Sequence, residues 1–160
     1  MIINIKEKSS ICSVDELLYN NFYKKTKIFW ETLCDGCNKK TYHIKTSLIS
    51  KLPKYFIISL QRYNYKSNSK NSATVNFNEE LNLKNIIDDN ICLDNTEYKL
   101  ISISNHKGSL NFGHYFAVCK STDGIWYECN DSNISKISNY ILKSNYCKTA
   151  CVYIYKSNII

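Results

Sequence analysis

Three residues of one predicted hairpin have side chains that could activate a thiol. His114 stands on the first strand, and the pair Asn130-Asp131 stands at the end of the second. A neutral imidazole takes a proton from a thiol only when the correct ring nitrogen is free, and a side-chain oxygen bonded to the other nitrogen fixes that tautomer. Either Asn or Asp can supply the oxygen. These residue types indicate the base and the orienting residue of a cysteine-protease site.

The spacing of the hairpin predicts which residues meet. A four-residue Ser-Thr-Asp-Gly turn follows Lys120, and Gly at its last position is typical of a connector between antiparallel strands. If Lys120 pairs with Ile125, counting back places His114 opposite Asp131. Directly opposed residues have Cβ atoms about 5 Å apart. A β-bulge would decide whether His114 contacts Asp131 or Asn130.

The same spacing permits an interpretation without chemistry. His114 would then be a half-buried hairpin histidine beside an ordinary Asn-Asp turn.

Gly113 precedes the histidine, and its missing side chain leaves room for a substrate backbone to approach.

The composition fits one folded domain that does not bind nucleic acid. Of 160 residues, 44% are hydrophobic, and the 13 tyrosines favour strands. The net charge is +7, but only Arg62 among the 21 basic residues is an arginine. Phosphate recognition by forked donors would use more arginines, so we expect solvated lysines and no nucleic-acid partner.

The eight cysteines are expected to be thiols or metal ligands and not disulfides. The longest apolar runs, such as Tyr55–Leu60, are too short to cross a membrane, so we expect no membrane partner. The apolar stretch at the start is too short for a signal peptide. These features predict an intracellular protein, cytoplasmic or nuclear.

Hydrophobic patterning predicts a strand-rich chain. Ser13 and Glu16 have the spacing of a capping box, which predicts a helix over Val14–Phe22. Leu81–Ile87 reads as a turn of helix or an irregular segment, and Tyr63–Ser72 as a polar surface loop. The expected strands are Ile2–Lys6, Ile28–Leu33, Lys40–Ile49, Tyr55–Leu60, Thr74–Phe77, Tyr98–Ser104, Tyr115–Lys120, Ile125–Cys129 and Ala150–Lys156.

Short turns between consecutive strands indicate a largely antiparallel sheet. The nearly continuous apolar run Tyr55–Leu60 predicts a central strand covered on both faces. The expected fold class is α+β, with a mostly antiparallel sheet and one or two short helices.

Four blocks in one order resemble the ubiquitin-specific proteases, which are papain-like cysteine deubiquitinases. Ser13–Phe22 resembles the helix after their finger region, and Leu52–Tyr63 their Leu-Pro…Leu-Lys-Arg-Phe strand. Tyr98–Ser132, with its Gly-His-Tyr and Trp-Tyr-Glu-Cys-Asn-Asp words, resembles their histidine box. Ala150–Tyr155 resembles their closing strand. The resemblance covers nearly the whole chain.

The resemblance implies the palm and part of the fingers of such a domain. Residues 1–160 would be a single, incomplete, carboxyl-terminal portion of it. The implied activity is thiol-mediated hydrolysis of peptide or isopeptide bonds after the terminal glycine of ubiquitin, with ubiquitin or a ubiquitinated protein as partner. The alternative is a catalytically inactive ubiquitin-binding or scaffold protein. The Tyr63–Ser72 loop would border the ubiquitin channel.

Residue roles also follow from the resemblance. It implies that His114 is the general base, Asn130 the third member of the triad, and Asp131 a neighbouring acid that assists or replaces it. His106 would stand at the head of the loop Ser104–Phe112, which in the family folds over the ubiquitin tail. The alternative for His106 is a loop residue that shapes the turn without chemistry.

Cys34 and Cys37 resemble one knuckle of the family's zinc ribbon. A structural zinc needs four ligands, usually from two such pairs. No cofactor is required by the expected chemistry, and a structural zinc is expected only if a second ligand pair is present. His43 is a weaker ligand candidate, because a strand histidine has an ordinary structural explanation.

The family's nucleophile box, of the type Gly-x-x-Asn-x-Gly-Asn-Thr-Cys-Tyr, does not occur in this sequence. Its oxyanion-hole Asn is missing with it. Cys12 stands at a helix start, where a thiol pKa can fall, but its surroundings do not match the box. We therefore expect these 160 residues to be inactive alone.

Overall fold

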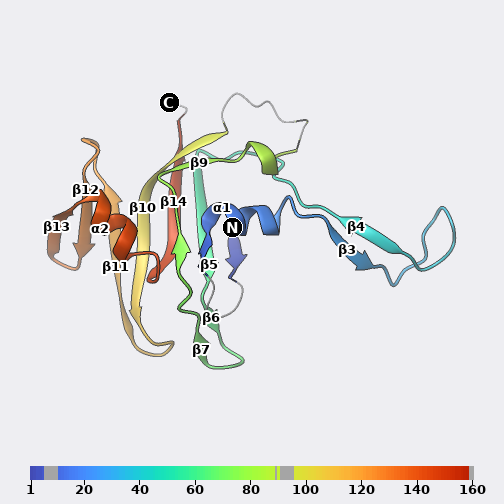
Figure 1. Cartoon of the computed structure of the whole chain (residues 1–160), viewed down its shortest axis with the longest axis horizontal. Coiled ribbons are helices and arrows are strands. Elements are labelled where there is room, and N and C mark those ends of the chain that lie inside the picture. The colour runs from blue at the N-terminus through green and yellow to red at the C-terminus, as the bar shows by residue number, and fades with distance from the viewer. Residues whose placement is uncertain (6–10, 89, 91–95, 159–160) are drawn as a thin grey trace.

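An eight-stranded sheet is the largest structural unit among the described residues (Figure 1). The computed structural model describes residues 1–5, 11–88, 90 and 96–158. Two small helices and one 3-10 helix accompany the strands. In chain order the elements are β1 (Ile2–Asn4), β2 (Cys12–Ser13), α1 (Val14–Asn21), β3 (Thr26–Phe29), β4 (Tyr42–Lys45), β5 (Tyr55–Gln61), β6 (Tyr63–Asn64), β7 (Ser69–Lys70), β8 (Val75–Asn76), β9 (Glu80–Asn82), η1 (Lys84–Ile86), β10 (Glu97–Gly108), β11 (Gly113–Lys120), β12 (Trp126–Asn130), β13 (Asn133–Ile137), α2 (Asn139–Asn145) and β14 (Ala150–Ser157).

The large sheet has the order β1-β5-β14-β10-β11-β12-β13, with β9 also paired to β10. Its pairs are antiparallel except β1 with β5. The expected α+β class with a mostly antiparallel sheet is confirmed. The long β10 lies between β14 and β11, so it connects the middle of the sheet to the hairpin that carries His114.

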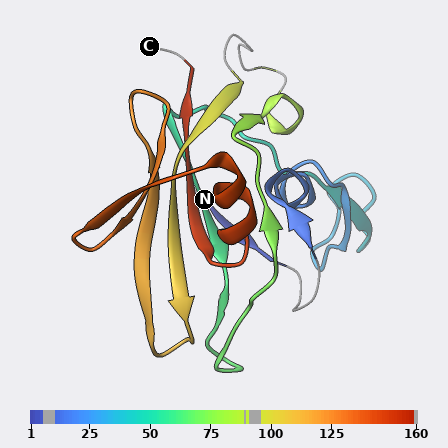
Figure 2. The same ribbon diagram turned by 60° about the vertical axis from the view of Figure 1, so that its left-hand side comes forward.

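Strand β5 is covered on one face only, which corrects the expectation of two covered faces. Phe56, Ile58 and Leu60 are buried in the core, whereas Tyr55 and Ile57 are 48% and 47% exposed. The alternation follows from the pleat, which points successive side chains to opposite faces. Helices α1 and α2 both contribute to the core, and Figure 2 shows them on the same side of the sheet.

The capping prediction for the first helix is confirmed. Helix α1 begins after Ser13, whose hydroxyl accepts a hydrogen bond from the Glu16 amide at 3.1 Å. Val14, Leu17 and Leu18 form its buried stripe. The cap satisfies one of the amides that a helix start leaves unpaired, and the stripe attaches the helix to the sheet.

Strands β3 and β4 form a two-stranded arm that projects away from the large sheet (Figure 1). Both are shorter than expected from the sequence. Phe29, Trp30, Tyr42 and Ile44 remain largely exposed on this arm. The apolar residues of the sequence predicted longer strands than the arm forms. These side chains bury little surface within the described part of the chain, so their apolar character did not mark strand pairing.

Two elements near the end of the chain were not predicted. Strand β13 reads Asn-Ile-Ser-Lys-Ile and is exposed except at Ile137, so it lacks a clear apolar face. Helix α2 buries only Leu142 along its length. Ser138 caps it by accepting a hydrogen bond from the Ile141 amide. Short elements with one buried residue give almost no periodic signal.

The segment expected to be a polar surface loop is a small hairpin. Strands β6 and β7 pair through Tyr63 with Lys70 and Asn64 with Ser69. The Asn64 side chain accepts hydrogen bonds from the amides of Lys66 and Ser67, which closes the turn. Local Asx contacts of this kind make a turn without glycine or proline.

The only arginine is a buried structural hub. The Arg62 guanidinium donates to the backbone carbonyls of Ala150, Asn71, Ala73 and Cys147. Arg62 is 1% exposed, and no carboxylate among the described residues lies within ion-pair distance of its guanidinium. Burial lowers the pKa of Arg62, while the carbonyl dipoles take the place of its hydration shell. Three distant segments are thereby joined at one side chain.

We predict that Arg62→Met lowers the free energy of unfolding by at least about 3 kcal/mol, because it leaves several buried carbonyls without a donor. Urea unfolding of the purified chain measures this loss. Lys156→Met, at an exposed position of β14, is the matched control and should change stability by less than about 0.5 kcal/mol. Equal stability of the two variants would contradict the role given to Arg62.

Candidate functional site

The hairpin of β11 and β12 has a register one residue away from the predicted one. Lys120 pairs with Trp126 and not with Ile125. The Gly124 amide donates to the Ser121 carbonyl, and Gly124 has φ +83°. A turn followed by a left-handed glycine is the geometry of a bulge that adds one residue to the loop. The predicted pairing of His114 with Asp131 is therefore wrong in register.

Beyond the paired residues, the side chain of His114 contacts Asn130. The His114 Nε2 atom lies 2.6 Å from the Asn130 Oδ1 atom. A carboxamide oxygen only accepts, so the imidazole donates from Nε2 and leaves Nδ1 without a proton in the neutral ring. That free nitrogen is the atom that can accept a proton from a thiol.

Asp131 is the more distant of the two orienting candidates. Its Oδ2 atom lies 3.8 Å from His114 Nε2, too far for a hydrogen bond but close enough for electrostatic attraction. The Asp131 side chain is 78% exposed, against 48% for His114. Asp131 has φ +53°, a left-handed conformation in the two-residue connection to β13 that directs its side chain outward. The structure thus settles the alternative between the two residues in favour of an Asn130 contact.

His106 is a buried strand residue and not part of a loop. Strand β10 continues to Gly108, so the connection to β11 contains only residues 109–112. The His106 Nδ1 atom lies 2.7 Å from the Tyr63 hydroxyl and 2.8 Å from Lys70 Nζ. Burial and the nearby Lys70 ammonium lower the pKa of His106. Its imidazole is therefore held neutral beside the His114 strand.

The position of Gly113 also has a structural requirement that the sequence did not indicate. A Cβ atom at this position would overlap the His106 ring and the Lys107 carbonyl. The missing side chain therefore accommodates a neighbouring strand of the same sheet. It allows His106 to fill the space beneath the end of β11, where Gly113 pairs with Gly108.

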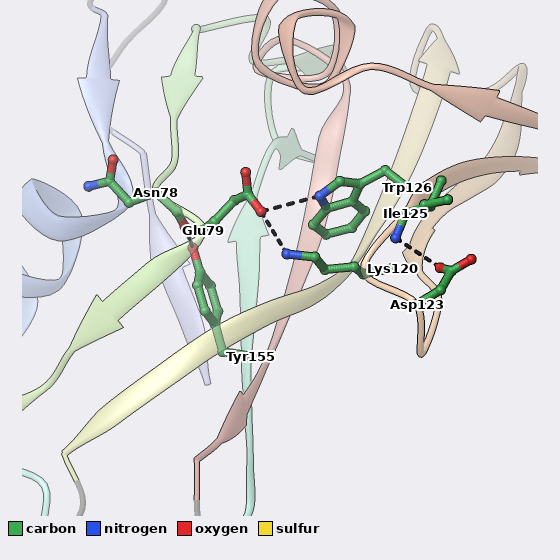
Figure 3. Close-up of polar contacts among 7 residues, drawn as sticks. All are labelled: Asn78, Glu79, Lys120, Asp123, Ile125, Trp126 and Tyr155. Carbon is green, nitrogen blue, oxygen red and sulfur yellow. Dashed lines mark hydrogen bonds and ion pairs between the residues drawn. The ribbon is translucent and has the colours of Figure 1, made fainter.

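The opposite end of the hairpin is fixed by an ion pair (Figure 3). Glu79 Oε2 accepts from Lys120 Nζ at 2.9 Å and from the Trp126 indole at 3.3 Å. Burial alone would raise the pKa of Glu79, but these two donors outweigh it and hold the pKa below the ordinary 4.5. The adjacent Asn78 carbonyl accepts from the Tyr155 hydroxyl. Glu79 thus connects the first residue pair of the hairpin to the segment before β9.

Cys34 and Cys37 lie in a tight turn of the arm. The Asn38 amide donates to the Cys34 carbonyl at 2.7 Å, and Asn38 has φ +50°. Hydrogen bonds from the amides of Cys37 and Gly36 lower the pKa of the Cys34 thiol. A low thiol pKa suits a zinc ligand. The pair thus fits one half of a tetrahedral zinc site.

The described residues contain no group of three or more metal-ligating side chains. His43 does not join the cysteine pair as an obvious ligand, because its Nε2 atom bonds the Thr41 hydroxyl and its ring packs on Trp30. A structural zinc held by Cys34 and Cys37 would therefore need two ligands from elsewhere, and it would cross-link the tip of the arm.

No thiol in the described part of the chain has the environment of a nucleophile next to His114. Cys12 is buried at the start of α1, and burial together with Glu16 raises its pKa. Burial also raises the pKa of Cys129, Cys147 and Cys151. The seven described cysteines are free thiols.

Sequence reasoning missed the residues that support the site. Glu79 and Lys70 lie outside the histidine hairpin, and no local motif marks them. Tyr63 ends the Leu52–Tyr63 block, but that block did not indicate its contact with His106. Arg62 had two visible signals, because it stands at the arginine position of the Leu52–Tyr63 block and is the single arginine of a lysine-rich chain. A single arginine in a chain with 20 lysines indicates a position that needs a forked hydrogen-bond donor.

Comparison with known proteins identifies the family and the fold of this chain. Residues 5–155 match the family model described as ubiquitin carboxyl-terminal hydrolase. Ubiquitin carboxyl-terminal hydrolase 8 of Saccharomyces cerevisiae is 32% identical over 148 residues, which cover 85% of this chain and 31% of that protein. Human ubiquitin carboxyl-terminal hydrolase 21 is 31% identical over 125 residues, which cover 75% of this chain and 22% of that protein.

Solved structures of the same family also superpose on this chain. A chain of the SAGA DUB module bound to monoubiquitin superposes with a TM-score of 0.82 at 30% identity, covering 99% of this chain and 35% of that chain. The same module bound to ubiquitin aldehyde also gives a TM-score of 0.82 at 30% identity, covering 99% and 36%. The fold is that of a papain-like ubiquitin-specific protease.

The chain belongs to the ubiquitin carboxyl-terminal hydrolase family. It spans about a third of the length of the yeast relative that it matches. None of the helices in the described ranges has the length and apolar character that crossing a bilayer requires.

We predict that Glu79→Gln lowers the free energy of unfolding at pH 7 by about 1–2 kcal/mol, because it removes the negative carboxylate to which Lys120 and Trp126 both donate hydrogen bonds. The native pKa of Glu79 lies below 4.5, so this contribution is present above pH 4.5 and disappears as the pH falls through the native pKa. Urea unfolding across this pH range measures it. Glu97→Gln, at an exposed position, is the control. A stability difference that does not shrink in acid would contradict the ion-pair account.

We also predict that Gly113→Ala destabilises the chain by about 1–3 kcal/mol, because the added methyl group meets the His106 ring and a backbone carbonyl. Thermal or urea unfolding measures the loss. Gly36→Ala is the matched control, since a Cβ there meets only Cys34 Sγ at 3.9 Å. Wild-type stability in Gly113→Ala would show that the close packing of His106 against β11 is wrong.

Proposed function

We propose that this chain supplies the base and the orienting residue of a cysteine-type deubiquitinase. The reaction is hydrolysis of the peptide or isopeptide bond after the terminal glycine of ubiquitin. The observation that carries the proposal is the hydrogen bond from His114 Nε2 to Asn130 Oδ1. The nucleophilic thiol and its oxyanion donors come from outside these 160 residues.

The proposed mechanism follows from the tautomer. Asn130 holds the proton of the neutral ring on Nε2, so Nδ1 of His114 accepts the proton of an approaching thiol. The thiolate attacks the carbonyl carbon of the terminal glycine, and His114 then returns the proton to the leaving amine. A water molecule, deprotonated by the same nitrogen, hydrolyses the resulting thioester and regenerates the thiol.

Asn130 and Asp131 have different parts in this mechanism. Asn130 fixes the ring without adding a charge, so the imidazole remains a neutral base before the reaction. Asp131, at 3.8 Å, is close enough to stabilise the imidazolium after proton transfer, although its exposure weakens the attraction. Asn130 is therefore the third member of the proposed triad, and Asp131 assists.

Ubiquitin is the proposed substrate because of the relatives and because of two exposed aromatic residues next to His114 in the chain. Solved relatives of the same fold are described as bound to monoubiquitin and to ubiquitin aldehyde. Phe112, in the turn before the histidine, is 82% exposed, and Tyr115 is 59% exposed. An exposed aromatic pair beside the base offers apolar contact to an extended peptide tail.

We predict that a chimaera joining the amino-terminal part of the yeast relative, up to where its match to this chain begins, to residues 1–160 hydrolyses a fluorogenic ubiquitin carboxyl-terminal amide. His114→Ala should lower kcat by about 10²–10⁴-fold, because it removes the general base. Asn130→Ala should lower kcat less, and Asp131→Asn less again.

His43→Gln is the matched control, since this histidine lies on the arm and bonds Thr41. It should leave kcat unchanged. Activity that does not depend on His114 would contradict the proposed base. A folded chimaera that binds ubiquitin but hydrolyses nothing would contradict the enzyme function and favour a ubiquitin-binding scaffold.

A further inference from the structure

Lys70 joins the two turns that border the candidate site. We propose that Lys70 is a positioning residue, which holds the end of β10 in place and through it the strand end that carries His114. The effect of Lys70 on catalysis depends on the function proposed above. Its effect on the position of the β10 end depends only on contacts within this chain.

The Lys70 ammonium has as many acceptors as it has N–H groups. Its Nζ atom lies 2.8 Å from the His106 carbonyl, 3.0 Å from the Gly108 carbonyl and 2.8 Å from the His106 Nδ1 atom. An ammonium group has three donors, so all three can be used at once. Lys70 is half-buried, which makes these charge-assisted bonds stronger than exposed ones.

The end of β11 needs support from outside the hairpin. Pairing between β11 and β12 runs from Lys120 only as far as Ala117. His114 lies beyond that point and pairs with Lys107 on β10. Pairing between β10 and β14 ends at Asn105, and one further backbone hydrogen bond, from the His106 amide to the Thr149 carbonyl, follows it at 2.9 Å. Lys107 and Gly108 lie beyond both. The last residues of β10 therefore have β11 on one side and the Lys70 ammonium as a further contact.

The His106 ring transmits the same constraint to the side chains. The single lone pair of its Nδ1 atom faces both the Lys70 ammonium and the Tyr63 hydroxyl, and because an ammonium only donates, the ring proton lies on Nε2. The ring packs against Tyr115 at a centroid distance of 4.5 Å and fills the space left by Gly113. The neighbours of His114 on both sides in sequence therefore contact one fixed imidazole.

The groups around His106 favour its neutral form. Lys70 is the nearest charge and opposes protonation of the ring. Burial raises the pKa of the Tyr63 hydroxyl and of the Cys151 thiol, so both neighbours are uncharged near neutral pH. The Tyr115 hydroxyl lies 3.4 Å from that of Tyr63. Loss of Lys70 would remove the like charge and one of the two donors to Nδ1.

The test compares Lys70→Met, Lys70→Arg and the control Lys66→Met in the 160-residue chain. Lys66 is exposed on the same small hairpin. Amide hydrogen exchange at residues 107–114 should become about tenfold faster or more in Lys70→Met, because the strand end opens locally. Lys70→Arg, which keeps donors for the two carbonyls, should restore most of the protection, and Lys66→Met should match the wild type. Residues 126–130 should keep their protection in every variant.

A histidine titration by NMR gives a second readout on the same samples. The pKa of His106 should rise towards the ordinary 6.5 in Lys70→Met and should stay low in Lys66→Met. In the chimaera, Lys70→Met should lower kcat while KM stays within about twofold, as expected for a lost alignment of the base.

Unchanged exchange at residues 107–114 in Lys70→Met would overturn the inference. Exchange that accelerates equally in β5 and β14 would also overturn it, because Lys70 would then support the fold in general. These readouts do not depend on catalysis. An inactive chimaera would refute the proposed function and leave the result for Lys70 to stand by itself.

Discussion

A buried positive charge surrounded by carbonyl groups is the constraint on which the rest of this structure depends. Arg62 follows β5 directly and donates to segments that are 9 to 88 residues away along the chain. Because its charge has lost its hydration, each of those carbonyls must remain in place, or the cost of burying the guanidinium is no longer offset. One side chain therefore fixes the start of β14 and the segment that follows β7.

The candidate site lies at the end of two routes from this hub. Along the first, the Ala150 carbonyl that Arg62 holds belongs to the residue paired with Asn105 on β10. Along the second, the Asn71 carbonyl belongs to the residue after Lys70, whose ammonium contacts the end of β10. Both routes converge on the strand that pairs with His114.

The hairpin itself is fixed at its opposite ends by different interactions. Glu79 holds the Lys120–Trp126 end, where burial makes an ion pair effective (Figure 3). The open end carries His114 and Asn130, which remain accessible to solvent and to a substrate. Rigidity at the closed end and at β10 thus leaves these two side chains exposed without leaving them free to turn, as the proposed catalytic role requires.

Much of this arrangement was predictable from the sequence, because local chemistry decided it. The Ser13 cap gave the first helix, the alternation of apolar residues gave the sheet, and the hairpin brought His114 to the Asn-Asp pair. The register was predicted one residue away, because the turn sequence alone did not show that Gly124 would adopt a left-handed conformation and add a bulge. A shift of one residue changes which partner lies opposite, although it left the histidine in reach of Asn130.

The parts that could not be predicted depend on contacts between distant segments. Whether one face of β5 or both are buried depends on which elements cover the strand. The apolar run of β5 by itself could not predict that only one face is covered. His106 was expected in a loop, but it lies on an extended β10 because the Gly108–Gly113 pair allows the strands to approach. Lys70 is one of many lysines in a lysine-rich chain, and only the fold shows that it contacts two carbonyls at the end of β10.

The most direct test of the central claim is the position of the ring proton on His114. Ring nitrogen NMR of the wild-type chain near neutral pH can assign it, with His43 as an internal reference and Asn130→Ala as the comparison. The account predicts a proton on Nε2 in the wild type and a mixture of tautomers in Asn130→Ala. A wild-type proton on Nδ1, or a ring that does not respond to the loss of Asn130, would contradict the claim that this hairpin presents a base.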